Sequence, residues 1–199
     1  VSATFAVNPS AFDKLPYDTH KDFAPITQAT TQPQVMVVHP SIAARSVKEL
    51  IALAKARPGQ LNYSSPGDGT LSQLAFELFK MTAGVNVVQI PYKGAGLSVT
   101  AVLGGEVQAC SGSAVTMLPH VTSGRLRAIA STGKRRSIAL PDVPTMAEQG
   151  LPDATLMGWY AFLAPARTPR AIVLRLNLKI IEVINMPDIA GRFATTQFA

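Results

Sequence analysis

The segment LNYSSPGDGTLSQLAFELF, residues 61–79, passes from a short strand-like run, through a glycine-rich loop, into an amphipathic helix. Thr70-Leu71-Ser72-Gln73 is a capping box, in which a threonine begins the helix and a glutamine three residues later returns a hydrogen bond. The apolar residues behind it recur at the spacing of one helix face, namely Leu71, Leu74, Ala75, Leu78 and Phe79. The segment therefore predicts a strand–loop–helix unit, with Gly84 as the helix C-cap.

The same alternation of strands and helices continues on both sides of this unit. Runs rich in apolar and β-branched residues predict strands over 34–38, 87–90, 107–110, 126–131 and 159–164. Helix signals predict one helix from the capping box Ser46–Glu49 to Pro58–Gly59, one over 97–103, a short one at 144–149, one with Thr168 as N-cap and Pro169 at its first position, and a last one from Pro187. This order predicts an α/β fold with a mainly parallel sheet.

Composition narrows the class of protein. The chain has 199 residues, of which 47% are hydrophobic and 15% charged, which is typical of a folded domain with a substantial core. The net charge is +6, but Lys134–Arg136 is the only basic cluster and no aromatic residues interleave with it. We therefore expect a solvated loop there and no nucleic-acid partner, while the net charge favours the approach of anions.

Several other classes of site find no support in the sequence. No apolar run reaches the roughly 18 residues of a membrane span, and Val1–Val7 shows no signal-peptide pattern. The single cysteine, Cys110, is expected to be a buried small hydrophobe and permits no internal disulfide. The three histidines lack the spacing of metal ligands, so we expect no metal and no cofactor.

The loop Ser64–Thr70 is the strongest candidate for a binding site. Small residues let the backbone approach a ligand, and the free amides of the helix start favour an anion. The loop is neither a Walker A motif nor GxGxxG, because it lacks Gly-Lys-[Ser/Thr] and a third glycine. An ordinary turn that needs glycine explains the spacing equally well. The candidate ligand-binding residues here are Ser64, Ser65, Gly67, Asp68, Gly69, Thr70 and Ser72.

Two further strand ends are expected at the same edge of the sheet, where open parallel sheets bind ligands. In the first, Tyr92 is a candidate pocket wall, and Lys93 either faces an acid or is simply solvated. The second is Ser111-Gly112-Ser113, after the predicted strand 107–110. We take Gly112 and Ser113 from it as candidate ligand-binding residues.

Catalytic patterns are missing from the sequence. There is no Gly-x-Ser-x-Gly elbow, no recognisable Ser/His/Asp grouping and no cysteine with a nearby histidine. Asp68 is a conceivable general base, but an acid beside a helix start is more often a cap or a solvated charge. We therefore expect a binding protein and no enzyme, with a hydrolase of an organic acid as the enzymatic alternative.

An ordered series of short motifs resembles the Bug/TctC family, the extracytoplasmic binding receptors of tripartite tricarboxylate transporters. The motifs are Leu15–Asp18 with Lys21–Pro25, Ser46–Leu50, Pro58–Tyr63, Ser65–Thr70, Pro91–Gly94, Leu103–Gln108, Leu118–His120, Leu140–Thr145 and Leu163–Pro165. They follow the order of the family across nearly the whole chain.

The resemblance implies a type II periplasmic-binding-protein fold, with two α/β lobes that close over a small carboxylate. It places part of the first lobe and a crossover at 1–24, the second lobe at 25–150, and a return crossover with the rest of an incomplete first lobe at 151–199. Ser2–Thr4 and Trp159–Tyr160 then lie near the crossovers, which adds Thr4 and Tyr160 to the candidate site.

The resemblance also implies a function. The protein is expected to be periplasmic, not membrane-inserted, and to pass its ligand to membrane transporter subunits. Many family members carry Asp-Asn where this chain has Gly112-Ser113, which favours a simple organic acid, such as a dicarboxylate, over an amino acid. The alternative is the effector domain of a transcription regulator, although no helix-turn-helix is visible in the sequence.

Overall fold

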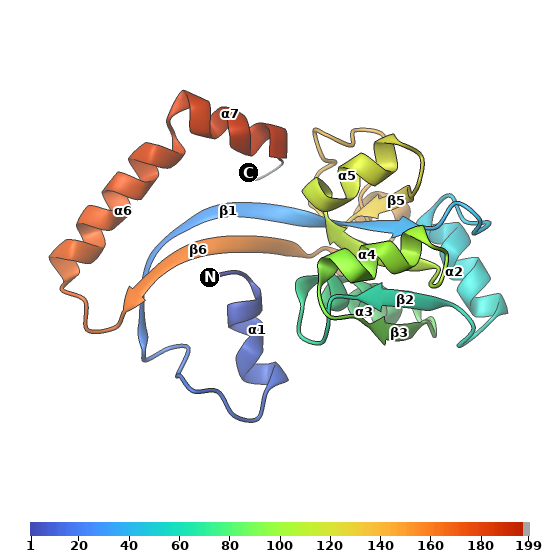
Figure 1. Ribbon diagram of the computed structural model, residues 1–199, viewed down its shortest axis with the longest axis horizontal. Coiled ribbons are helices and arrows are strands. Elements are labelled where there is room, and N and C mark those ends of the chain that lie inside the picture. The colour runs from blue at the N-terminus through green and yellow to red at the C-terminus, as the bar shows by residue number, and fades with distance from the viewer. Residues whose placement is uncertain (197–199) are drawn as a thin grey trace. The chain divides into compact units, whose positions relative to one another are not determined.

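The computed structural model describes residues 1–196 (Figure 1). The chain divides into two compact units. Unit 1 consists of Val1–Gln32 and the chain from Gly158 onward, and unit 2 consists of Pro33–Met157. The strand β1 (Phe23–Val38) contributes residues to both units, and the strand β6 (Met157–Pro165) begins at the end of unit 2.

Unit 2 contains most of the sheet. Its strands lie in the order β3 (Val88–Pro91), β2 (Asn62–Ser65), β4 (Ala109–Ser113), β1 and β5 (Arg127–Ser131), and β6 also pairs with β1. The strand β2 is parallel to both β3 and β4, whereas β1 runs antiparallel to β4 and β5. Four strands therefore share one direction, which confirms the mainly parallel sheet, and β1 is inserted against them.

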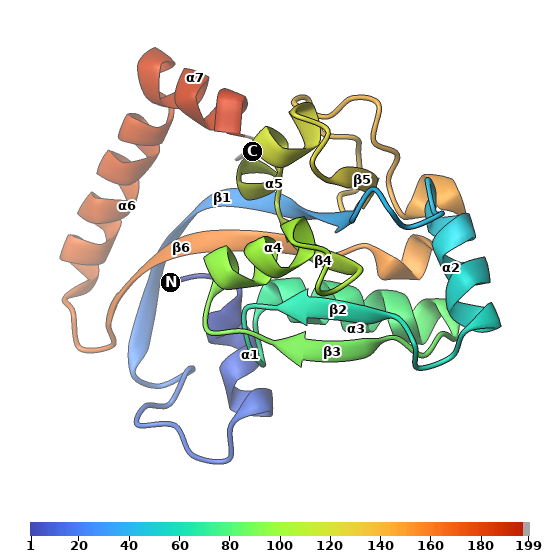
Figure 2. The same ribbon diagram turned by 45° about the vertical axis from the view of Figure 1, so that its right-hand side comes forward.

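Both faces of this sheet are covered (Figure 2). Along β1, Met36 and Val38 pack into one buried cluster, with Tyr63, Phe76 and Phe79, while Val35 and Val37 pack into another, with Cys110 and Met117. This alternation of two buried faces explains why the run 34–38 is almost continuously apolar. The helices of unit 2 are α2 (Val47–Ala56), α3 (Leu71–Ala83), α4 (Ala95–Leu103) and α5 (Ala114–Thr122), and two short 3-10 helices follow at Ala147–Gln149 and Pro152–Ala154.

Unit 1 is built from the first residues of the chain, its last two helices, and parts of two long strands. It contains α1 (Thr4–Ala11), the first part of β1, most of β6, α6 (Arg170–Ile184) and α7 (Pro187–Thr196). Val1–Ala3 pair with β6: the Ala161 amide donates to the Val1 carbonyl at 2.9 Å, and the Ala3 amide to the Trp159 carbonyl at 2.9 Å. The first residues thus act as a further short strand beside β6.

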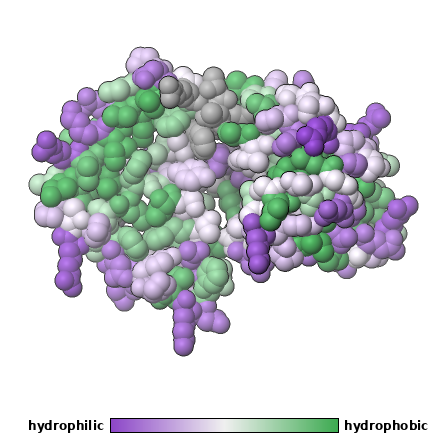
Figure 3. All heavy atoms as spheres, viewed as in Figure 1, coloured by the Kyte–Doolittle hydropathy of each residue, from purple (hydrophilic) through white to green (hydrophobic). Residues whose placement is uncertain are grey.

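Helix α6 leaves several large apolar side chains exposed. The helix is attached to β1 through Asn177, whose side-chain amide donates to the Ile26 carbonyl at 2.7 Å. Other residues of the helix expose apolar side chains, including Leu174, Leu178 and Ile181. Figure 3 shows apolar side chains gathered over this part of unit 1. Gathered apolar surface of this kind is normally covered by another part of the protein or by a partner.

The structure corrects several sequence-based boundaries. Strand β1 begins at Phe23, eleven residues before the predicted strand, because residues 23–33 mix polar residues and prolines that hide the strand signal. The sequence patterns do not predict helices α1 and α5, which both contain a proline, Pro9 and Pro119 respectively. Pro169, not Thr168, occupies the N-cap of α6, and no side chain caps that helix. Within residues 1–196 no helix is both long and apolar enough to cross a membrane.

Candidate functional site

Three helix N-termini lie at one edge of the unit 2 sheet. The parallel strands β3, β2 and β4 are adjacent, and each leads directly into a helix, α4, α3 and α5 respectively. The turns after β2 and β3 are bonded together, because the Tyr92 amide donates to the Ser65 carbonyl at 2.8 Å and the Gly94 amide to the Pro66 carbonyl at 3.3 Å. The predicted placement of both loops at one sheet edge is therefore confirmed. We call this edge the rim; its helix dipoles favour an anion.

The start of α3 is shaped by its capping residues. Thr70 is the N-cap: its hydroxyl accepts from the Gln73 amide at 3.4 Å and donates to the Gly67 carbonyl at 2.8 Å. The Gln73 side chain in turn accepts from the Gly69 amide at 2.7 Å. In the described part of the chain the amides of Leu71 and Ser72 have no acceptor. Two backbone donors of the first turn are thus left for a ligand or for water.

Asp68 is held by side-chain amides. Gln89 Nε2 donates to Asp68 Oδ1 at 2.9 Å and to Ser65 Oγ at 2.8 Å, and Gln73 Nε2 donates to Gln89 Oε1 at 3.1 Å. These bonds join the loop to β3 and to the first turn of α3. Asp68 therefore stabilises the loop conformation through side-chain amides, and the N-cap of α3 is Thr70 instead of this acid. Gln89 is a supporting residue that the sequence motifs did not single out.

The two serines at the end of β2 are engaged inside unit 2. Ser64 is 1% exposed, and its hydroxyl donates to the Ser98 carbonyl at 2.8 Å and accepts from Ser98 Oγ at 2.9 Å. Ser65 is fully buried and its hydroxyl accepts from Gln89 Nε2 and from the Gly67 amide. Both hydroxyls are therefore bonded to other residues of unit 2 and stabilise the rim. This geometry lends no support to direct contacts between these hydroxyls and a ligand.

The turn after β3 carries Tyr92 and Lys93. The Tyr92 hydroxyl donates to Glu106 Oε2 at 3.4 Å, and desolvation together with the nearby Glu106 charge raises the pKa of Tyr92. Lys93 is exposed and makes no hydrogen bond or ion pair with the described residues. It is the one basic side chain in the three strand-to-helix connections of the rim. Its position suits both a solvated charge and a partner for an arriving acid.

The end of β4 explains one of the candidate glycines. Gly112 and Ser113 are the last residues of β4, which is longer at this end than the predicted strand. A Cβ on Gly112 would overlap Met117 Cε in the buried core, so the glycine makes room for this methionine. Ser113 is the N-cap of α5 and its hydroxyl accepts from the Thr116 amide at 3.3 Å. These two residues thus have clear structural roles at the rim.

Gln34 is a rim residue that sequence reasoning missed. Its Oε1 accepts from the Ser72 hydroxyl at 3.2 Å, and Ser72 also receives the Ser111 hydroxyl on its carbonyl at 2.7 Å. Gln34 stands opposite Ser113 in the β1–β4 register. The sequence placed it at the start of a strand, but only the long-range pairing with β4 shows that this start lies at the rim.

The candidate residues are split between the two units. Eleven of the thirteen lie in unit 2, on or beside the rim, whereas Thr4 and Tyr160 belong to unit 1. Thr4 is the first residue of α1, and Tyr160 forms a bridge with Ser2 on β6. The assignment of Thr4 and Tyr160 to the site stays a prediction.

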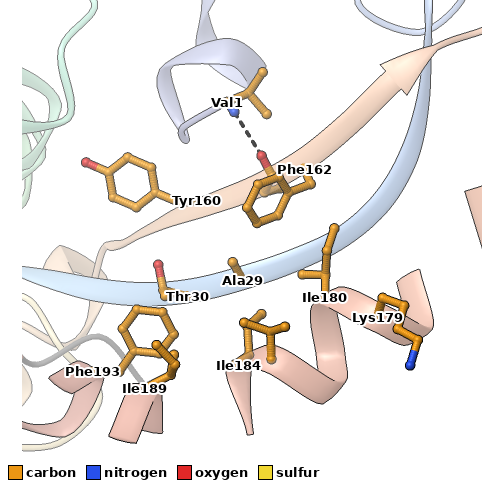
Figure 4. A pocket seen from close by; sticks show the side chains of 12 residues that line it. Val1, Ala29, Thr30, Tyr160, Phe162, Lys179, Ile180, Ile184, Ile189 and Phe193 are labelled. Carbon is orange, nitrogen blue, oxygen red and sulfur yellow. Dashed lines mark hydrogen bonds between the residues drawn. The ribbon is translucent and has the colours of Figure 1, made fainter. Parts of the chain in front are cut away.

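Unit 1 has a groove of its own, with a volume of about 670 Å³ (Figure 4). Apolar side chains of β6, α6 and α7 line most of it, including Phe162, Ile180, Val183, Ile184 and Ile189. The lysine that lines it is already paired, since Lys179 Nζ contacts Glu182 at 2.6 Å. The groove therefore suits an apolar partner better than a small carboxylate.

The comparisons with known proteins identify the family. The model of the TctC family, described as the tripartite tricarboxylate transporter family receptor, matches residues 1–199. The chain is 37% identical to the protein BugT of Bordetella pertussis over 193 residues, which cover 97% of this chain and 59% of BugT. The chain therefore belongs to the TctC family, whose members are periplasmic solute-binding receptors.

Solved structures show the same fold. The chain matches R. palustris Rpa4515, solved with adipate, with a TM-score of 0.91 and 27% identity, covering 100% of this chain and 67% of that one. It matches MatC (Rpa3494) from Rhodopseudomonas palustris, solved with bound malate, with a TM-score of 0.82 and 27% identity, covering 96% of this chain and 63% of that one. The two-lobe periplasmic-binding fold is thereby confirmed for a chain that spans about three fifths to two thirds of the lengths of these relatives.

Proposed function

We propose that this TctC-family chain is part of a periplasmic receptor that captures a small carboxylate, such as a dicarboxylate, and presents it to membrane transporter subunits. The observation that carries the proposal is the rim, where three adjacent parallel strands lead into three helix N-termini. Free amides at helix starts bind carboxylates through hydrogen bonds and through the helix dipole. The proteins solved with adipate and malate support the same ligand class.

The donors of the rim are mostly neutral, which suits a transport receptor. The start of α3 offers backbone amides, and the nearest acid, Asp68, is held by amide side chains instead of by a basic residue. A carboxylate bound by neutral donors gains less than one bound by a buried arginine fork. Such a site releases its ligand readily after capture. Binding alone, without bond cleavage, is what we assign to this chain.

The first lobe is proposed to be completed by parts of the protein outside this chain. In this proposal residues 25–150 form the second lobe, and residues 1–24 and 151–199 form the crossovers and pieces of the first. The exposed apolar side chains of α6 and the groove of unit 1 support it, because surfaces of this character are normally covered. The remaining segments would cover them and contribute further ligand-binding residues.

A thermal-shift experiment on the full-length protein tests the proposed function. The panel would contain malate, adipate, succinate, citrate and aspartate, with dimethyl succinate as an uncharged control. A ligand at about 100 times its dissociation constant stabilises the folded state by roughly 2.7 kcal/mol. For a protein of this size that is on the order of several degrees.

We expect at least one of the acids to raise the melting temperature and the neutral diester to leave it unchanged. Recovery of the unchanged acid after prolonged incubation would support capture without chemistry, whereas turnover would favour an enzyme. If none of the acids shifted the transition, carboxylate capture would be the wrong assignment.

A further inference from the structure

Gln34 lies at the rim, beside the end of β4 and next to the end of β5, two strand ends that come from distant parts of the sequence. It stands opposite Ser113, the last residue of β4, and its neighbour Val35 stands opposite Ser131, the last residue of β5. The strand β1 runs antiparallel to β4 and β5. The residues of β1 around Gln34 therefore lie beside the last residues of both strands. The side chain reaches the first turn of α3 through Ser72.

The backbone of Gln34 is fully engaged and holds the residue in place. Its amide donates to Thr132 Oγ1 at 2.8 Å, and its carbonyl accepts from the Thr132 amide at 2.9 Å. Thr132 is itself buried, and its hydroxyl also donates to the Leu156 carbonyl at 2.6 Å. Gln34 is therefore a rigidly placed residue.

The side-chain amide of Gln34 is buried but only half satisfied. The residue is 2% exposed and its Oε1 accepts from Ser72, while Nε2 has no acceptor among residues 1–196. The fully buried, unpaired side-chain atoms of the described chain are Thr19 Oγ1 and Thr30 Oγ1, so Gln34 Nε2 keeps contact with solvent. A buried amide with two unused N–H donors is costly unless a water or a ligand accepts from it.

We propose that Gln34 is a ligand-binding residue, whose Nε2 donates a hydrogen bond to an oxygen atom of the bound carboxylate. The proposal rests on the function proposed above and adds a side chain to a site otherwise built from loop amides. The Ser72 hydroxyl is bonded to the Gln34 side chain, and the free backbone amide belongs to the same Ser72. Nε2 of Gln34 on β1 and the Ser72 amide on α3 are therefore neighbouring donors. In this proposal each of the two donors takes one oxygen of the carboxylate group.

The test compares variants of the full-length protein in calorimetric titrations with malate and adipate. Gln34→Met keeps the length of the side chain and removes both its donor and the oxygen that accepts from Ser72, so affinity should fall by about tenfold or more, as expected for a lost hydrogen bond to a charged group. Gln34→Glu places a second carboxylate against the ligand and should weaken binding further. Gln60→Met is the matched control, because Gln60 is exposed and precedes β2 at the opposite end of the sheet.

Melting curves without ligand would show whether each variant remains folded. Loss of affinity in Gln34→Met, with a cooperative transition and with Gln60→Met unaffected, would support the proposal. Unchanged affinity in Gln34→Met while the parent protein binds would overturn the role of Gln34 and leave the receptor function standing. Tighter binding by Gln34→Glu would mean that the residue faces a cationic group, which also contradicts the proposal. If the parent protein bound neither acid, the proposed ligand class would fail and this inference with it.

Discussion

Replacement of Gly67 by valine tests the proposed loop without altering its polar side chains. Gly67 has a φ of +125°, a conformation that β-branched residues essentially do not adopt. A Cβ at position 67 would cause no steric clash, because its nearest neighbour would be the Tyr92 carbonyl oxygen at 3.9 Å. The effect of the substitution must therefore come from the backbone.

The magnitude follows from the strain of that backbone. A non-glycine residue held at such a φ costs about 1–3 kcal/mol. A loss of this size should lower the melting temperature of the full-length protein by about several degrees. The loop can instead relax to an ordinary φ, but this breaks the 2.8 Å hydrogen bond from Thr70 to the Gly67 carbonyl and moves the first turn of α3. Either route displaces the free amides, so we expect affinity for the acid to fall by at least about tenfold.

The matched control for Gly67→Val is Gly84→Val. Gly84 caps the other end of α3 with a φ of +61°, and a Cβ added there would have no neighbour within 4 Å, so valine again strains the backbone without a steric clash, to a smaller degree and distant from the rim. Titration calorimetry and melting curves on the full-length protein would measure both effects. Gly84→Val should lose stability and keep affinity. Equal loss of affinity in both variants, or normal affinity in Gly67→Val, would refute the argument that this loop positions the ligand.

Two further predictions concern stability and reactivity. Thr70→Ala removes the N-cap of α3 and should lower the stability by about 1 kcal/mol, which is a fall of roughly 2–4 °C in melting temperature. Thr70→Ser should recover most of this loss. An unchanged melting temperature in Thr70→Ala would contradict the role of Thr70 as the cap. Burial raises the pKa of the Cys110 thiol to about 12, so the folded protein at pH 8 should react with a thiol reagent only as fast as it unfolds. The unfolded thiol has a pKa of about 8.5, so the stability that this group contributes is fully present below that pH. The contribution should decline as the pH rises toward about 12. In denaturant titrations Cys110→Ala should lack the share of the pH-dependent loss of stability that comes from this thiol.

The local elements of the fold were largely predictable from sequence. Ser46 and Thr70 are the N-caps of α2 and α3, and Gly84 is a left-handed C-cap, as the capping patterns predicted. These signals depend on residues only a few positions apart, so they can be read without knowledge of the fold. The placement of two loops at one sheet edge also followed, because parallel strands end on the same side. The extra length of β1 was missed, since polar residues interrupt its pattern.

The roles of individual side chains at the rim depended on contacts between distant parts of the chain. The sequence pattern made Ser64 a candidate ligand contact, but pairing with Ser98, 34 residues away, turns its hydroxyl into the core. The same patterns passed over Gln34, which meets Ser72 at a separation of 38 residues and Thr132 at 98. Periodicity and capping report the residues that form an element and the edge at which it ends. Which hydroxyl or amide is already bonded, and which is left for a ligand, is decided only when the strands pair and desolvate their neighbours.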